Sequence, residues 1–234
     1  MSDPRPAIAV VTFPGSNDDR DAALALDRLG ADARAVWHAE RDLPGDTAGV
    51  VLPGGFSYGD YLRCGAIARF APVMQAVARF AHGGGLVLGI CNGFQVLCEA
   101  GLLPGALRPN ASLEFVCRDV RLCLERADTP FTARAEPGQT LTIPIKHGEG
   151  CYFADDGLLA DLDRNGQVAL RYEENPNGSV AAIAGVTNER GNVFGLMPHP
   201  EHAVDALIGS GSTDGTLILG SLVDAARERL LTAV

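Results

Sequence analysis

One cysteine lies in a setting typical of a nucleophile. Cys91 is flanked, two residues away on each side, by Gly89 and Gly93, where an apolar run predicts a buried strand that leads into a helix. The glycines let strand and helix approach closely, so the side chain between them projects from the turn. N–H groups and the dipole at the helix N-terminus favour a thiolate. The pattern predicts that Cys91 is a nucleophile; the other five cysteines are interpreted as inert.

A histidine late in the chain is the best candidate for the base that a thiol nucleophile requires. His199 precedes Pro200, which favours an extended conformation at the histidine. In extended chain, residues two apart share a face, so Glu201 is expected beside His199, where it would orient the imidazole. His202 is an alternative base, but it is expected on the opposite face.

Two glycine-containing turns are further candidates. The pair Gly54-Gly55 follows an apolar run, and its exposed N–H groups could complete an oxyanion site together with the N–H of Asn92. His147 is followed by Gly148, which suggests close approach of backbone to a ligand, although a plain tight turn explains the segment almost as well.

Alternating strand and helix patterns in the first half would bring these turns together. Because parallel strands present their carboxyl ends at one edge, a doubly wound parallel sheet would place the loops after Val11, Leu52 and Ile90 at a common ligand site. The expected strands are Ala7–Val11, Ala33–Trp37, Gly49–Leu52 and Leu86–Ile90. We expect three helices: the first begins at Asp18 or Asp19 and ends at Leu29, the second covers Tyr61–Phe80 with a candidate break at Pro72, and the third covers Cys91–Glu99.

The second half predicts short strands and one closing helix. No linker is evident, so we expect a single domain, residues 1–234, with a smaller β-rich insertion. The expected strands are Arg118–Leu124, Thr140–Ile145, Val168–Tyr172, Val180–Val186 and Asn192–Leu196, followed by a helix over Thr216–Leu231.

Composition excludes several classes of protein. The formal net charge is −10, which argues against nucleic-acid binding, and 47% hydrophobic residues argue against disorder. The most apolar window, Leu86–Leu103, contains polar residues, so no membrane span is expected. The N-terminus lacks the pattern of a signal peptide, which predicts a cytoplasmic protein with free thiols. The only lysine, Lys146, lies in no phosphate-binding loop, which suggests that ATP chemistry belongs to another chain.

Taken together, the motifs P-G-G, G-I-C-x-G-x-Q and H-P-E resemble the class I (triad) glutamine amidotransferases. Longer segments resemble the members that serve de novo purine biosynthesis. These are FPGSNDDRD (13–21), PGGFSYGDYLRCGAIAR (53–69), KHGEG (146–150), ENPNGS (174–179), MPHPE (197–201) and GSTDG (211–215).

The resemblance implies a flavodoxin-like, mostly parallel sheet and a role for each matching residue. Cys91 would attack the glutamine amide, with His199 and Glu201 completing the triad. The oxyanion would be held by the N–H groups of Gly55 and Asn92, and glutamine by Gly54, Phe56, Gln95, His147 and Gly148. No metal is implied. Asp18 stands where relatives often carry cysteine and His202 where arginine is usual, and neither is expected to touch the triad.

The resemblance also implies partners. Ammonia released from glutamine would pass to an ATP-dependent synthetase that converts formylglycinamide ribonucleotide to formylglycinamidine ribonucleotide. A large synthetase subunit, which would hold ATP and Mg²⁺, and a small bridging subunit are implied, with no cofactor in this chain. The alternatives are a subunit of another class I amidotransferase, a stand-alone cysteine hydrolase and a non-catalytic subunit.

Overall fold

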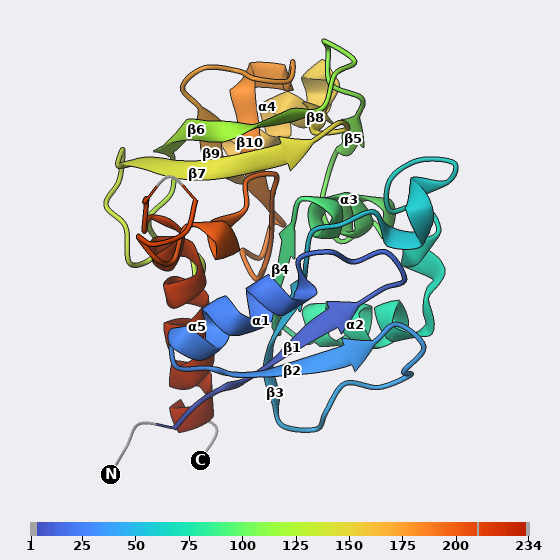
Figure 1. The fold of residues 1–234 in the computed structure, drawn as a ribbon, viewed down its shortest axis with the longest axis vertical. Helices are drawn as coiled ribbons and strands as arrows, with labels where there is room; N and C mark the ends of the chain where they lie inside the picture. The colour runs from blue at the N-terminus through green and yellow to red at the C-terminus, as the bar shows by residue number, and fades with distance from the viewer. Residues whose placement is uncertain (1–3, 210, 233–234) are drawn as a thin grey trace.

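The computed structural model describes residues 4–209 and 211–232, which form a nine-stranded sheet with helices packed against it (Figure 1). The strands are β1 (Ala7–Thr12), β2 (Asp32–Trp37), β3 (Thr47–Leu52), β4 (Leu86–Ile90), β5 (Ala106–Arg108), β6 (Val116–Leu124), β7 (Thr140–His147), β8 (Cys151–Phe153), β9 (Val168–Tyr172), β10 (Ile183–Thr187) and β11 (Val193–Leu196). The helices are α1 (Asp19–Arg28), α2 (Pro72–His82), α3 (Asn92–Glu99), α4 (Asp156–Arg164) and α5 (Gly215–Thr232), with 3-10 turns η1 (Ser57–Asp60), η2 (Ala68–Phe70), η3 (Val180–Ala182) and η4 (Pro200–His202).

Five neighbouring strands form the parallel part of the sheet. They lie in the order β2-β1-β3-β4-β11, and every adjacent pair among them is parallel. The predicted α/β fold with a large parallel sheet is confirmed for this part. The carboxyl ends of β1, β3 and β4 therefore share one edge, as the alternating pattern required.

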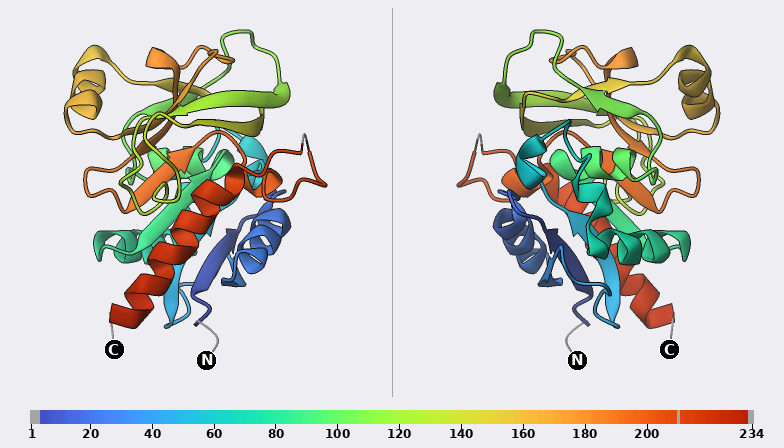
Figure 2. Two further views of the ribbon diagram at one scale, coloured as in Figure 1. Left: turned by 90° about the vertical axis from the view of Figure 1, so that its left-hand side faces the viewer. Right: turned by 90° about the vertical axis from the view of Figure 1, so that its right-hand side faces the viewer.

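Helices cover both faces of this parallel part. A Cβ on Gly49 of β3 would lie 3.6 Å from the Leu222 side chain of α5, whereas Leu52 lies against Gly93 of α3. Residues three apart on a strand point to opposite faces, so α5 and α3 pack on opposite sides. The two views of Figure 2 show the sheet between its helices and the long α5 crossing it.

The β-rich second half continues the same sheet. Strands β10, β9, β6 and β7 extend it beyond β11, and all their pairings are antiparallel. A separate two-stranded sheet pairs β5 with β8. The predicted strands of this half are present, but a 3-10 turn occupies the first three residues of the expected strand Val180–Val186. Strands β5 and β8 and helix α4 were not expected.

The predicted helix over Tyr61–Phe80 is wrong in its first half. Helix α2 begins at Pro72, which occupies the first helical turn, where a proline's missing N–H costs nothing. Before it, Asp60 and Leu62 have positive φ angles of 52° and 73°. Gly65 lies so close to α3 that a Cβ there would meet the Val96 nitrogen at 2.8 Å. Contact with α3 thus overrides the helical pattern of this segment.

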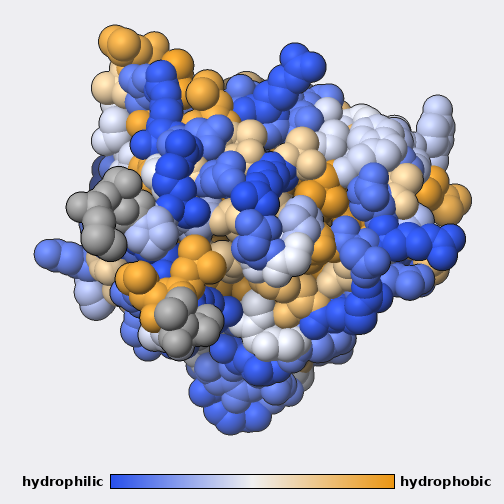
Figure 3. All heavy atoms as spheres, turned by 90° about the horizontal axis from the view of Figure 1, so that it is seen from below, coloured by the Kyte–Doolittle hydropathy of each residue, from blue (hydrophilic) through white to orange (hydrophobic). Residues whose placement is uncertain are grey.

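The end of the molecule that carries both chain termini is mainly polar. Figure 3 views it from below and shows hydrophilic residues over most of the face, with apolar residues in small groups between them. No helix in the described part of the chain is long and apolar enough to cross a membrane.

Gly93 is required where α3 crosses β3, because a Cβ there would meet the Leu52 carbonyl oxygen at 2.0 Å. We expect Gly93→Ala to lower the free energy of unfolding by roughly 2 kcal/mol or more, since backbone must move to relieve the overlap. Gly45→Ala is the control, because a Cβ at Gly45 meets nothing within 4 Å. Urea unfolding of both variants measures the effect, and equal stability would contradict this account of the turn.

Candidate active site

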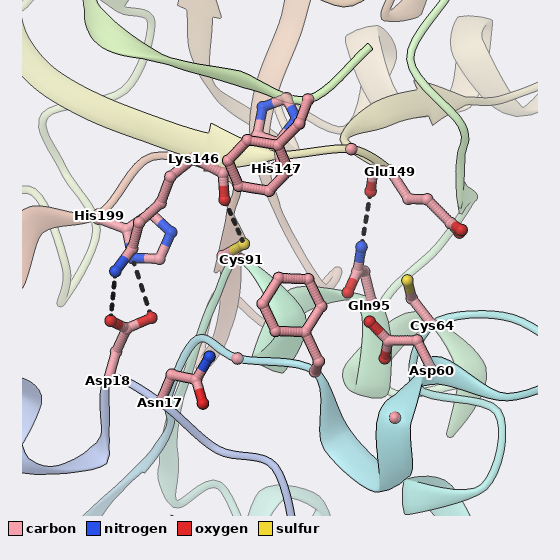
Figure 4. Close-up of a pocket in the computed structure, with 15 residues that line it drawn as sticks. Asn17, Asp18, Asp60, Cys64, Cys91, Gln95, Lys146, His147, Glu149 and His199 are labelled. Carbon is pink, nitrogen blue, oxygen red and sulfur yellow. Dashed lines mark hydrogen bonds and ion pairs between the residues drawn. The ribbon is translucent and has the colours of Figure 1, made fainter. Parts of the chain in front are cut away.

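Cys91 occupies a strained turn between β4 and α3. Its φ of 50° and ψ of −104° are unusual for a residue with a side chain, and its N–H donates to the Leu196 carbonyl at 2.8 Å. A Cβ on Gly89 would lie 2.6 Å from the Leu97 side chain, and one on Gly93 would overlap β3. Both flanking glycines therefore permit the close packing that the sequence predicted. The thiol projects from the turn at the start of α3 (Figure 4).

The chain brings His199 to the same edge through β11. This strand runs parallel to β4, with Leu196 paired to Ile90, so both chains leave the sheet side by side. The His199 ring is fully buried, and its Nδ1 lies 2.6 Å from Oε1 of Glu201. Its other nitrogen, Nε2, has no hydrogen-bond partner among the described residues and points toward Cys91 (Figure 4).

Charge around His199 favours the imidazolium. Burial alone would lower its pKa, but the negative charge of Glu201 and then that of Cys91 outweigh burial and raise the pKa of His199 to about 10. A protonated imidazole beside a thiolate is the arrangement that activates a cysteine nucleophile. The geometry thus brings Cys91, His199 and Glu201 together as predicted.

The local reason for the contact between His199 and Glu201 differs from the expectation. The chain does not continue extended past His199, because Pro200–His202 forms the 3-10 turn η4. Pro200 begins this turn and His199 precedes it at φ −106° and ψ 86°. The turn also brings His202 back toward His199, with ring centroids 5.5 Å apart. The prediction that His202 faces away was therefore wrong.

Asp18 and His202 touch the predicted triad, contrary to expectation. Asp18 Oδ2 lies 3.7 Å from His199 Nδ1, and His202 Nε2 lies 3.6 Å from Glu201 Oε1. The two also contact each other, Nε2 to Oδ1, at 3.2 Å. Asp18 further forms an ion pair with Lys146. They were missed because the turn at η4 and the loop after β1 meet only in the folded chain.

A cavity of about 410 Å³ opens above Cys91 and His199. Most of the predicted glutamine-binding residues line it, and so do several that the sequence did not single out. Gly54 does not line the cavity. It packs against the His199 ring, because a Cβ added at Gly54 would lie 2.6 Å from His199 Cε1. The lining residues are Asn17, Asp18, Gly55, Phe56, Gly59, Asp60, Cys64, Cys91, Gln95, Phe115, Lys146, His147, Gly148, Glu149 and His199.

Two backbone N–H groups are available for an oxyanion. Gly55 lies at φ 147°, held by a bridge between Ser16 and Gly55, and in the described structure its N–H donates to no backbone or side-chain acceptor. Asn92 is the first residue of α3, where N–H groups lack intrahelical partners. The Asn92 side chain is used structurally: its Oδ1 accepts from the Ser57 N–H at 3.1 Å. Asn92 itself is buried and does not line the cavity; its N–H is a candidate donor because it directly follows Cys91.

His147 lines one wall of the cavity and is held in place by neighbouring polar groups. Its Nδ1 lies 3.0 Å from Asn110 Oδ1, and burial above all, then the nearby charge of His199, lowers the pKa of His147 to about 4. It is therefore neutral at physiological pH. A Cβ on Gly150 would lie 2.3 Å from the imidazole, so this glycine makes room for the ring. Asn177, from the segment ENPNGS, supports the turn by donating to the Gly150 carbonyl at 2.8 Å.

Two carboxylates and a thiol at the far end of the cavity were also missed. Asp60, Cys64 and Glu149 lie on the other side of Cys91 from His199 (Figure 4). Gln95, which was predicted, links this end to the nucleophile turn: its Nε2 donates to the Glu149 carbonyl at 2.6 Å. Cys64 falls in the segment Tyr61–Phe80 that the sequence placed in a helix, and Asp60 directly precedes it, so the pattern did not indicate that either residue reaches the cavity.

Comparisons with known proteins found similar chains over most of the length of this one. Residues 5–216 match the model of the CobB/CobQ-like glutamine amidotransferase domain. Phosphoribosylformylglycinamidine synthase subunit PurQ of Rubrobacter xylanophilus is 61% identical over 220 residues, which cover 94% of this chain and 99% of that protein. The corresponding subunit of Salinibacter ruber is 58% identical, over 92% of this chain and 94% of that protein.

A solved structure is similar over nearly the whole chain. A chain in the structure of PurLQS from Thermotoga maritima superposes with a TM-score of 0.86 at 47% sequence identity. The match covers 94% of this chain and 98% of that one.

The pairing of His199 with Glu201 predicts a pH-dependent stability. Because the folded-state pKa of His199 is raised to about 10 from its ordinary 6.5, the stabilisation is complete below about pH 6.5 and is lost as the pH rises through 10. We expect Glu201→Gln to lower the free energy of unfolding by roughly 3–5 kcal/mol at pH 6 and by much less at pH 10. Urea unfolding at pH 6, 8 and 10 measures this, with Glu189→Gln, an exposed site, as control. A difference that stays constant with pH would refute the assignment.

Proposed function

The chain belongs to the CobB/CobQ-like glutamine amidotransferase family, and on that premise we propose that its cavity hydrolyses glutamine to glutamate and ammonia. The observation that carries the proposal is the position of Cys91, at a strained helix N-terminus, in the same cavity as the unpartnered Nε2 of His199.

In the first half-reaction the Cys91 thiolate attacks the side-chain amide carbon of glutamine. The carbonyl oxygen becomes an oxyanion, which the N–H groups of Gly55 and Asn92 stabilise. His199 then donates its Nε2 proton to the amide nitrogen, the C–N bond breaks, and ammonia leaves. A glutamyl thioester on Cys91 remains.

In the second half-reaction water attacks the thioester. Neutral His199 accepts a proton from the water through Nε2, the C–S bond breaks, and glutamate and the Cys91 thiolate are released. Glu201 holds Nδ1 throughout, so Nε2 stays oriented toward the thiol, and the imidazolium is stabilised before it donates its proton to the amide nitrogen and again after it accepts one from water. Gln95, Phe56 and the His147-Gly148 turn would position the substrate.

The ammonia is supplied to phosphoribosylformylglycinamidine synthase, in purine biosynthesis. The curated relatives are subunits of that enzyme, and the similar solved chain comes from a PurLQS complex. The chain therefore works with a large synthetase subunit and a small subunit, which together convert formylglycinamide ribonucleotide to formylglycinamidine ribonucleotide. ATP and Mg²⁺ would bind to the large subunit.

Three finer assignments belong to the same proposal. The parallel strand order β2-β1-β3-β4-β11 is that of flavodoxin-like folds, with the site at the carboxyl edge. The antiparallel strands form a β-rich insertion within one domain. The six cysteines are all free, which supports a reducing, cytoplasmic compartment.

Replacing the nucleophile should separate the two nitrogen donors. We expect Cys91→Ser to reduce glutamine-dependent synthesis by the complex at least about 10⁴-fold, because the nucleophile of a triad is lost. Synthesis from ammonium salts should be unchanged, because the synthetase site is intact. Cys117→Ser, an exposed cysteine, is the matched control. Equal loss with both nitrogen donors, or retained activity with glutamine, would contradict the proposed function.

A further inference from the structure

The ion pair between Asp18 and Lys146 lies at the centre of an unusual charge cluster. The Asp18 side chain is nearly fully buried, and three groups that can carry positive charge surround it: Lys146 Nζ, His202 Nε2 at 3.2 Å and His199 Nδ1 at 3.7 Å. Burial alone would raise the pKa of Asp18, but these three neighbours hold it well below its usual range. Asp18 is therefore a carboxylate at neutral pH.

His199 thus has two carboxylates on the same ring nitrogen. The Nδ1 proton goes to Glu201 at 2.6 Å, and Asp18 at 3.7 Å adds negative charge without a strong hydrogen bond. Two buried carboxylates beside a thiolate would repel each other and the thiolate unless a cation compensates them. Lys146, the only lysine of the chain, supplies that cation.

The same pair is connected to the nucleophile through the backbone. Cys91 Sγ lies 3.9 Å from the Lys146 carbonyl oxygen. On the other side, the Asp18 N–H donates to the Gly54 carbonyl at 3.2 Å, and Gly54 lies directly against the His199 ring. One ion pair therefore joins strand β7, which touches the thiol, to the loop that holds the imidazole (Figure 4).

We propose that Asp18 and Lys146 form a positioning pair, which fixes the position of the His199 imidazole relative to the Cys91 sulfur and stabilises the charged forms of both groups. The inference rests on the proposed function, because it assigns a role within the same reaction. Asp18 is a second carboxylate for His199, and Lys146 is its counter-ion. Neither residue exchanges a proton with substrate.

The charges that face His199 set the expected direction of each effect. They come from the loop after β1, the turn after β4, strand β7 and turn η4: Asp18, Cys91, Lys146, His147, Glu201 and His202. Removing the negative charge of Asp18 lowers the pKa of His199, whereas removing the positive charge of Lys146 raises it. The basic limb of the pH profile for glutamine turnover should therefore move to lower pH when the Asp18 charge is removed and to higher pH when the Lys146 charge is removed.

The test uses the complete complex with glutamine and with ammonium salts. For Asp18→Asn we expect kcat with glutamine to fall roughly 10- to 100-fold with KM changed less than about threefold, because proton transfer is disturbed rather than binding. Its basic limb should shift to lower pH. Lys146→Met should also lower kcat but shift that limb to higher pH. Synthesis from ammonium salts should stay unchanged in both variants.

The double variant Asp18→Asn, Lys146→Met supplies the decisive comparison. If the two residues act as a pair, its loss in kcat is smaller than the product of the single losses, since neither charge is left unpaired. Asp19→Asn, a neighbouring carboxylate that contacts Thr12, is the matched control. Thermal unfolding of each variant reports whether the fold is retained.

The outcomes separate this inference from the proposed function. Three results would overturn the positioning pair but leave the proposed glutaminase function intact. They are full glutamine activity in both single variants, losses that multiply in the double variant, and pH profiles whose basic limbs do not move. Glutamine activity that survives in Cys91→Ser would overturn the function itself.

Discussion

The parallel pairing of β11 with β4 is the constraint on which the site depends. It joins residues more than a hundred positions apart, so that the chain leaving Leu196 runs beside the turn at Cys91. The Cys91 N–H donates to the Leu196 carbonyl, which continues the ladder one residue beyond the strand. Since His199 follows Leu196 by three residues, this pairing brings the imidazole to the edge of the sheet that carries the thiol. The remaining contacts adjust this arrangement and do not create it.

The site combines backbone strain and buried charge, each of which lowers the stability of the fold when it is not compensated. A non-glycine residue with positive φ costs roughly 1–3 kcal/mol, and buried carboxylates cost several more unless they are paired. Cys91 carries the first cost, and Glu201 and Asp18 carry the second. The compensation is local: close packing of β4 against α3 holds the turn, while His199 and Lys146 pair with the carboxylates and His202 contacts Asp18. Packing in the rest of the sheet offsets the free-energy cost of the strained backbone and the charges at this edge.

Neutral polar contacts support the opposite wall of the cavity. Asn110 and Asn177 hold His147 and the turn up to Gly150, and Ser179 accepts from the Tyr152 N–H at 3.0 Å. These residues come from loops between antiparallel strands, where backbone groups lack ladder partners. The second half of the sheet therefore contributes a wall and its supports, whereas the parallel half contributes the nucleophile and, through β11, the histidine. Both halves are needed to enclose substrate.

The sequence alone determined the turn at Cys91 and the parallel strands, because glycine spacing and short-range periodicity act within a few residues. It also placed Glu201 beside His199, but for the wrong reason, since the turn η4 and not an extended chain makes that contact. It placed Tyr61–Phe80 in one helix, because periodicity does not register that Gly65 must pack against α3. It set Asp18 and His202 apart from the triad and gave Lys146 no role in the site. Only the tertiary structure decided those contacts, because a partly buried ion pair between residues 128 positions apart leaves no local pattern and exists only after the sheet has brought its loops together.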